Sequence, residues 1–219
     1  MGSFYGNVLV ARACEEVVPL LGGAASGAGD EGIPGYALPV GPRHTVIYPD
    51  PETGAPDLAG PLSRLLGAPA LGMYVFDSDV LLMSVYEDGE LRHHYDSYPG
   101  YFDEGETDED GEPVATDDFF DNPTWPDPVG VDPEAFLPLA AGPVDRAALE
   151  SVLRVIPLDP EDGEDGRYVF ANDQHYDVMA TLGLNAPRLS TGFGYLSSGE
   201  LPYETAADEL VVLGGAARP

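Results

Sequence analysis

The residues with the clearest potential for chemistry are three histidines and one pair of aspartates, which lie in separate parts of the chain. Asp77 and Asp79 flank a serine, and paired carboxylates can perform acid–base or glycosidic chemistry when burial separates their pKa values. His93, His94 and His175 could join them from other elements as bases or metal ligands. If all five groups converged, they would form the site of a small hydrolase or a metal-assisted enzyme.

The same residues also have ordinary structural explanations, which we favour. Asp77-Ser78-Asp79 is typical of an Asx turn that starts a strand. His93 and His94 are neighbours on an expected strand, so their side chains should point to opposite faces. His175 and Asp177 lie two residues apart on an expected helix and should diverge. We therefore expect no catalytic residues, no metal site and no cofactor, and we keep the converging Asp/His enzyme as the alternative.

The most unusual segment is 103–121, which combines a dense negative charge with aromatic residues. Its ten acidic residues are Asp103, Glu104, Glu106, Asp108, Glu109, Asp110, Glu112, Asp117, Asp118 and Asp121. Such a run repels itself and is typical of a solvated loop. The aromatic residues in and around it predict that its ends pack onto the domain; they are Tyr98, Tyr101, Phe102, Phe119, Phe120 and Trp125.

The acidic run only partly matches a calcium-binding loop. Counted from Glu106, Asp108, Asp110 and Gly111 fill positions three, five and six of an EF-hand loop. Position one is not Asp, and position twelve is Asp117 instead of the bidentate Glu. We expect adventitious divalent binding at most.

The whole chain is strongly acidic, which narrows its partners. Its 219 residues contain 9 Lys+Arg, all of them Arg, against 39 Asp+Glu, for a formal net charge of −30. This field disfavours direct binding to nucleic acid or to anionic membranes. The one cysteine, Cys14, excludes an intrachain disulfide, and the N-terminal residues lack the pattern of a signal peptide, so we expect a cytoplasmic protein. Lysine-free acidity also arises in GC-rich genomes and salt-adapted cytoplasms, which leaves hydration alone as a further explanation.

The elements that would position these residues are short strands and short helices. Residues 70–98 predict an antiparallel meander, because strands 71–76, 80–86 and 91–97 are joined by tight turns and Asp88-Gly89 is a type I′ signal. The other expected strands are 3–11, 36–40, 44–48, 193–196 and 210–213. The expected helices are 15–21, 57–66, 135–140, 145–154 and 173–182, with N-caps at Asp132, Asp145 and Asn172.

These elements predict an α+β fold, in which an antiparallel sheet around the 70–98 meander is packed by helices and carries a long acidic loop. We expect a single domain over residues 1–219. Residues 1–100 form its sheet-rich half, 101–131 its acidic, aromatic-bearing loop and 132–219 its helix-rich half. Strand order and oligomeric state do not follow from the pattern.

Several segments resemble a widespread family of uncharacterised bacterial proteins. In the sheet-rich half these are Phe76-Asp77-Ser78-Asp79-Val80-Leu81, Tyr86 to Leu91, Tyr95 to Phe102 and the start Gly2-Ser3-Phe4-Tyr5. In the helix-rich half they are Tyr168-Val169-Phe170, His175, Leu182-Gly183-Leu184, Gly192 to Leu196 and Gly199 to Pro202. The resemblance implies one integrated domain and supplies no activity or catalytic residues. The acidic loop, 103–121, looks like an addition that this chain makes to the pattern of that family.

These observations favour a non-catalytic binding protein, namely an inhibitor or immunity-type partner of a basic protein. A large negative field steers association with a cationic surface, and acidic side chains on an aromatic-bearing loop can mimic a phosphate backbone, so the partner could itself bind nucleic acid. The expected partner-binding residues are Asp103, Glu104, Asp108, Asp110, Asp117, Asp118, Phe119, Phe120 and Trp125.

Overall fold

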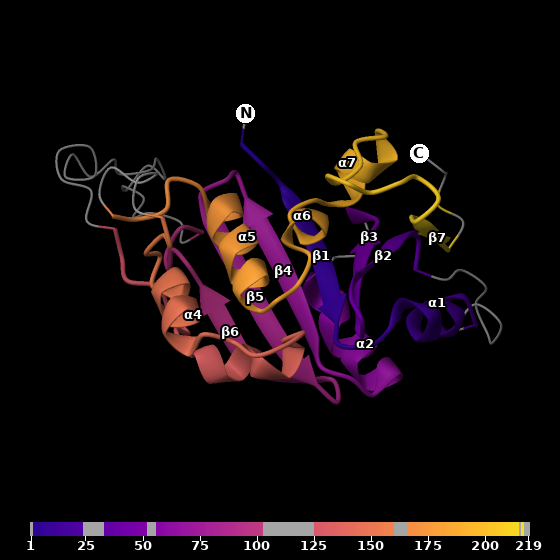
Figure 1. Cartoon of the computed structure of the whole chain (residues 1–219), viewed down its shortest axis with the longest axis horizontal. Helices are drawn as coiled ribbons and strands as arrows, with labels where there is room; N and C mark the ends of the chain where they lie inside the picture. The colour runs from indigo at the N-terminus through magenta and orange to yellow at the C-terminus, as the bar shows by residue number, and fades with distance from the viewer. Residues whose placement is uncertain are drawn as a thin grey trace, which may run out of the picture.

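The chain folds around one seven-stranded antiparallel sheet. A computed structural model describes residues 2–23, 33–51, 56–102, 125–159, 166–214 and 216. The strand order is β6-β5-β4-β1-β3-β2-β7, and helices cover the sheet, so the expected α+β class is confirmed. Figure 1 shows the sheet nearly face-on, with α4 and α5 lying in front of the strands β4–β6.

The predicted meander forms one half of the sheet. Its strands are β4 (Ala70–Phe76), β5 (Val80–Glu87) and β6 (Glu90–Asp96), and each pairs antiparallel with the next. Asp88 and Gly89 have φ of 53° and 81°, as a type I′ turn requires. Asp77 and Ser78 also have positive φ, 50° and 63°, and the amide of Asp79 donates to the carbonyl of Phe76. Both turns therefore match the right-handed twist of the strands that they join.

The centre of the sheet is the N-terminal strand β1 (Tyr5–Val10), which lies between β4 and β3 (His44–Pro49). Side chains alternate along it, so Tyr5 and Leu9 enter one core while Val8 and Val10 enter the other. The sheet continues through β2 (Gly35–Gly41) to the short edge strand β7 (Val211–Leu213).

The face of the sheet in view carries the helices of the C-terminal half. They are η4 (Pro133–Leu139), α4 (Arg146–Leu153), α5 (Ala171–Thr181), α6 (Ala186–Leu189) and α7 (Phe193–Ser197). Asp132 and Asp145 are the predicted N-caps, and their carboxylates accept the amides of Glu134 and of Ala147 and Ala148. The apolar sides of these helices close the larger core against β1, β4 and β5.

The opposite face carries two helical segments. They are α1 (Cys14–Gly23) and the pair η3 (Pro56–Leu58) and α2 (Ala59–Leu66), which ends at Gly67 with φ 58°. Val17, Leu21, Leu62 and Leu66 are buried there. The sheet is thus covered on both faces, which explains why its central strands are almost continuously apolar.

Three local predictions were wrong. Residues 193–196, expected as a strand, form α7, because Phe193 stacks on Tyr36 at 5.3 Å and the chain closes a helical turn from Gly192. Asn172 is inside α5 instead of capping it, and its amide donates to Asp173. The helical spacing of the leucines in segments 15–21 and 57–66 predicts that Leu20 and Leu65 face the core, but they are 38% and 52% exposed.

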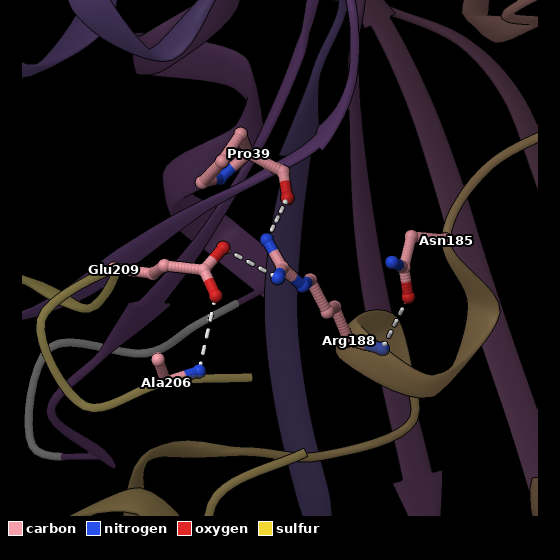
Figure 2. A network of polar contacts seen from close by, with 5 residues as sticks. All are labelled: Pro39, Asn185, Arg188, Ala206 and Glu209. Carbon is pink, nitrogen blue, oxygen red and sulfur yellow. Dashed lines mark hydrogen bonds and ion pairs between the residues drawn. The ribbon is translucent and has the colours of Figure 1, made fainter. Parts of the chain in front are cut away.

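The C-terminal segment is held to the sheet by a partly buried ion pair. Figure 2 shows the Arg188 guanidinium between the Pro39 carbonyl, at 3.0 Å, and the Glu209 carboxylate, at 2.6 Å. Glu209 also accepts the amide of Ala206 at 3.0 Å. These two hydrogen bonds hold the pKa of Glu209 below its usual range, and the bond from Ala206 has the larger effect. This network holds the chain segment that leads into β7 against the sheet.

Candidate functional site

An aromatic cluster is formed by residues that flank the acidic segment in the sequence together with Phe4 and Phe76. Phe76, at the end of β4, contacts the rings of Phe4, Tyr101 and Phe102 at centroid distances of 5.0, 5.8 and 5.1 Å. Tyr98 links Tyr101, at 5.4 Å, to Trp125, at 5.1 Å. We call these six residues the aromatic cluster: Phe4, Phe76, Tyr98, Tyr101, Phe102 and Trp125.

The cluster is more exposed than a structural core requires. Phe4, Phe102 and Trp125 are 47%, 52% and 53% exposed. Buried aromatic rings stabilise a fold by leaving water, whereas half-exposed ones arranged edge to face form a contact surface with apolar area still to bury. In the sequence, Phe102 directly precedes the acidic run 103–121, and Trp125 follows it by four residues.

The chain that carries Trp125 is pinned to the edge strand β6. Asp96 and Val129 exchange backbone hydrogen bonds of 3.0 and 2.9 Å, and the Nε2 of His93 lies 2.7 Å from the carbonyl oxygen of Gly130. Gly130 has φ 77°, and a Cβ there would overlap the carbonyl of His94, so glycine is needed for this close approach. The position of Trp125 is therefore set by the sheet.

The other side of the cluster is organised by the turn between β4 and β5. The hydroxyl of Ser78 accepts the amide of Ser3 at 2.7 Å, and its carbonyl accepts the amide of Ala171 at the start of α5 at 2.6 Å. One type I′ turn thus joins the N-terminal residues that carry Phe4 to the helix that borders the site.

A pocket of about 410 Å³ lies between the aromatic cluster and the chain before α5. Tyr98 and Trp125 form one wall, and the residues of the opposite wall, Arg167 and Tyr168, come from the chain that leads into α5. The described lining residues are Asp79, Ser97, Tyr98, Trp125, Pro126, Val155, Arg167, Tyr168, Val169, Ala171 and Gln174. This size is within the usual range of ligand pockets, about 300–1,000 Å³.

The buried lining residue with the most polar atoms is Gln174, which is 1% exposed. Its amide nitrogen donates to the hydroxyl of Tyr95, at 2.6 Å, and to the carbonyl of Val152, at 2.8 Å. Both amide protons are thus used within the core, and the carbonyl oxygen is what Gln174 can offer a ligand. Ser97 accepts the amide of Leu81 at 2.8 Å, so its hydroxyl proton is not used by that bond.

The rim of the pocket contains charges of both signs. Asp79 is exposed and accepts the hydroxyl of Tyr101 at 3.3 Å. Burial and then the Asp79 charge raise the pKa of Tyr101. The guanidinium of Arg167, whose side chain is 30% exposed, lies 3.8 Å from the fully exposed carboxylate of Asp127.

Val155 lines the same pocket in an unusual conformation. Its φ is 62°, in the left-handed region that a β-branched residue rarely occupies. Its carbonyl accepts the amide of Tyr168 at 3.2 Å, which ties the pocket wall to the end of α4. Strain of this kind is often found at functional sites, where the surrounding structure maintains it.

Two further hollows flank this region. A pocket of about 620 Å³ lies on the other side of Tyr168, whose hydroxyl donates to Asp177 there at 2.5 Å; burial and that carboxylate raise the pKa of Tyr168. A pocket of about 430 Å³ includes Tyr5, Tyr195 and Tyr203. Neither includes a residue of the aromatic cluster.

The five residues of the alternative enzyme site are distributed over separate elements. Asp77 and Asp79 belong to the β4–β5 turn, where the positive φ of Asp77 and Ser78 replaces the extended backbone that would place both carboxylates on one face. His93 and His94 pair with Val85 and Ser84, several residues further along β5. All five residues are described in the structure, and no hydrogen bond or ion pair joins any two of them.

The three histidines have separate partners. His93 packs on Phe136, and the Nδ1 of His94 lies 2.9 Å from the hydroxyl of Ser84. His175 is fully buried, 2.8 Å from the Tyr5 hydroxyl, and burial lowers its pKa to about 3. Within the described part of the chain, no group of three His, Cys, Asp or Glu residues is placed to hold a metal ion.

Of the predicted partner-binding residues, Trp125 can be placed, and it belongs to the aromatic cluster. The other eight lie outside the described residues: Asp103, Glu104, Asp108, Asp110, Asp117, Asp118, Phe119 and Phe120. The expectation that the ends of the acidic segment pack onto the domain is confirmed at Tyr98, Tyr101, Phe102 and Trp125.

Sequence reasoning missed the second wall of the pocket. Arg167 and Tyr168 lie more than forty residues after Trp125, and nothing local in the sequence relates them to it. Gln174 did carry a signal, since it stands on the buried face of α5 with Ala171 and Val178, at helical spacing. A polar residue at such a position needs partners in the core or in a pocket.

Comparisons with known proteins provide no family for this chain: no family model, no curated protein and no solved structure matches it. The resemblance to a bacterial family stays a prediction. Among the described residues, no helix combines the length and the apolar character needed to span a membrane.

Proposed function

We propose that this protein binds a basic protein, as an inhibitor or immunity-type partner, through the aromatic cluster and the acidic segment 103–121 that lies between Phe102 and Trp125 in the sequence. The observation that carries this proposal is that Phe4, Phe102 and Trp125 are about half exposed in one aromatic cluster, two of whose members, Phe102 and Trp125, flank a segment with ten carboxylates in the sequence. The aromatic rings supply apolar area to bury, and the charge selects a cationic surface.

Charge complementarity identifies the class of occupant. With a net charge of −30, the chain repels acidic surfaces and attracts basic ones over about a Debye length, roughly 8 Å at physiological ionic strength. Steering of this kind raises association rates, whereas aromatic anchors near the centre of an interface supply most of the binding free energy. Both parts are needed for a tight and specific complex.

The test begins with capture of basic proteins from a lysate of the native host and continues with the purified partner. We expect a stoichiometric complex whose affinity falls as salt rises. The double variant Phe102→Ser/Trp125→Ser leaves the charge unchanged and should weaken binding by tenfold or more, since exposed aromatic anchors contribute about 1–2 kcal/mol each.

The matched control is Leu65→Ser/Leu91→Ser, which removes two apolar side chains of similar exposure from α2 and from the start of β6. It should leave the affinity unchanged. Two results would mean that the chain adsorbs cations without a specific site. One is that the aromatic variant binds the partner as tightly as the wild type does. The other is that the wild type binds an unrelated basic protein, such as a lysozyme, as tightly as it binds the partner. Either result contradicts the proposal.

A further inference from the structure

We infer that the 410 Å³ pocket beside Trp125 accepts an arginine side chain of the basic partner, an inference that rests on the proposed function. The pocket shares Tyr98 and Trp125 with the aromatic cluster. A side chain that projects from a basic surface docked on this cluster would therefore lie next to the pocket.

The walls suit a flat cation. Tyr98 and Trp125 lie 5.1 Å apart between ring centroids with an interplanar angle of 47°, so they form an angled aromatic wall. Tyr168 adds a third ring on the opposite side, and its hydroxyl is engaged by Asp177 outside this pocket. A guanidinium stacks on aromatic faces and is held there by the ring quadrupoles, more favourably than the compact, strongly hydrated ammonium of lysine.

The polar lining residues offer acceptors, as a guanidinium requires. Asp79 contributes a carboxylate at the rim, and Gln174 can offer its carbonyl oxygen because its amide protons are donated to Tyr95 and Val152. Arginine carries five N–H donors and no acceptor, so these groups complement it. An acidic ligand would meet the Asp79 carboxylate and the field of the whole chain.

Arg167 does not reverse this complementarity. Its guanidinium pairs with Asp127, which lies outside the pocket lining and is fully exposed. The Arg167 side chain is 30% exposed, and its charge acts on the buried Tyr95 hydroxyl, where it opposes the burial that raises the pKa of Tyr95, so this cation faces the pocket as well as Asp127. Among the described lining residues, Asp79 and Arg167 therefore balance each other, and the preference for a guanidinium rests on the aromatic walls, the carbonyl oxygen of Gln174 and the negative field of the whole chain.

The experiment uses the single tryptophan of the chain as its reporter. Because Trp125 is the one Trp among 219 residues, its indole N–H gives one resonance in a ¹H–¹⁵N spectrum of the intact protein. The probes are the N-acetyl methylamides of arginine, of lysine and of citrulline, which has the shape of arginine without its charge. We expect a saturable shift with arginine in the millimolar range, and binding of lysine and citrulline at least several-fold weaker.

Two variants locate the binding. Tyr98→Leu removes one ring of the wall, and Asp79→Asn removes the rim charge; both should weaken arginine binding several-fold. Asp57→Asn is the control, because it removes an equal charge from η3 on the other side of the sheet and should have no effect. Asp79 and Asp57 are both exposed, so neither variant endangers folding.

The outcomes separate this inference from the proposed function. Equal shifts with citrulline and arginine, a shift that never saturates, or binding that survives Tyr98→Leu would each overturn the arginine pocket. If arginine binds here but the basic partner is bound equally well by Phe102→Ser/Trp125→Ser, the pocket stands and the proposed function fails. If the partner depends on the aromatic cluster but arginine does not bind, the proposed function stands and the pocket inference fails.

Discussion

The buried imidazole of His175 predicts that this protein loses stability as the pH falls from neutrality, by an amount that can be worked out from its surroundings. The ring is fully buried under α5, with Nδ1 2.8 Å from the hydroxyl of Tyr5 and Nε2 3.0 Å from the sulfur of Met73. A thioether only accepts, so Nε2 carries the proton and Nδ1 accepts from Tyr5. This neutral ring satisfies both contacts, and a second proton would place an uncompensated charge in the core.

The magnitude follows from the two pKa values. Burial lowers the pKa of His175 from the ordinary 6.5 to about 3, so between these values the unfolded chain binds one proton that the folded protein does not. The free energy of unfolding therefore contains a His175 contribution that is complete above pH 6.5 and falls as the pH drops toward 3. The slope approaches about 1.4 kcal/mol per pH unit once the pH is well below 6.5, which amounts to roughly 2–3 kcal/mol between neutral pH and pH 4.5.

The assay compares urea unfolding of the wild type and of His175→Gln at several pH values from 7 to 4.5. Carboxylates titrate in both proteins, so the difference in their pH dependence isolates the imidazole. We expect the wild type to lose about 1.4 kcal/mol more per pH unit than the variant, with equal m-values. In the wild type, the ring resonances of His175 should keep their neutral shifts down to pH 4.5, a measurement that does not need the variant to fold. Parallel stability curves, or a ring that titrates near pH 6.5, would refute the reasoning.

Three further predictions concern single contacts. Asp145→Ala removes the acceptor of two amides at the start of α4 and should lower the free energy of urea unfolding by about 1 kcal/mol, whereas Asp145→Ser should restore most of it. Val155→Gly relieves a left-handed backbone and should raise the free energy of unfolding by about 1 kcal/mol; a loss of that size would show that the valine side chain contributes more than its strain costs. Glu209→Gln removes the negative charge that pairs with Arg188 and leaves a single accepting oxygen where the amide of Ala206 and the guanidinium of Arg188 now use one each, so amide exchange in β7 should become faster, while the adjacent control Asp208→Asn should leave it unchanged.

Much of the fold can be predicted from local patterns in the sequence. The meander β4–β5–β6 was predictable because alternating apolar residues are joined by Asp88-Gly89, whose positive φ values only a few residue types adopt readily. Helix α4 was predictable from the cap at Asp145 and its apolar spacing. The central place of β1 was not, because its partners come from residues 45–47 and 70–75, and pairing over such separations has no local signature.

The misassigned segment 193–196 shows where tertiary contacts override local preference. Phe193 and Tyr195 favour a strand by composition, yet the ring of Phe193 stacks on Tyr36, and the chain turns into a helix of five residues to reach it. Gly192 begins that turn against Tyr5, where a Cβ would come within 2.7 Å of the Tyr5 Cβ. Contacts of this kind are set by the packed sheet, which a window of a few residues does not contain.

The candidate site was predictable on one side only, for the same reason. The aromatic residues next to the acidic run stand out by composition, because a plain solvated linker has no need of Tyr98 or Trp125. The opposite wall is contributed by Arg167 and Gln174, which the packing of α5 against β4 and β5 brings into place. A pocket formed by two distant segments exists only once the sheet has formed.

The acidity of the chain has two explanations, and the position of the aromatic cluster distinguishes them. If the charge served hydration alone, half-exposed aromatic rings would be a liability at the place where carboxylates are densest, because they invite association without helping solvation. Here Phe102 and Trp125 stand directly at the ends of that segment and are 52% and 53% exposed. An interface needs this combination, since charge brings a basic partner close and aromatic rings then hold it. The two explanations therefore differ in one measurable respect. Under hydration alone, Phe102→Ser/Trp125→Ser would change neither stability in low salt nor binding to basic proteins. Under the binding proposal, it weakens binding to the basic partner by tenfold or more and leaves stability in low salt unchanged.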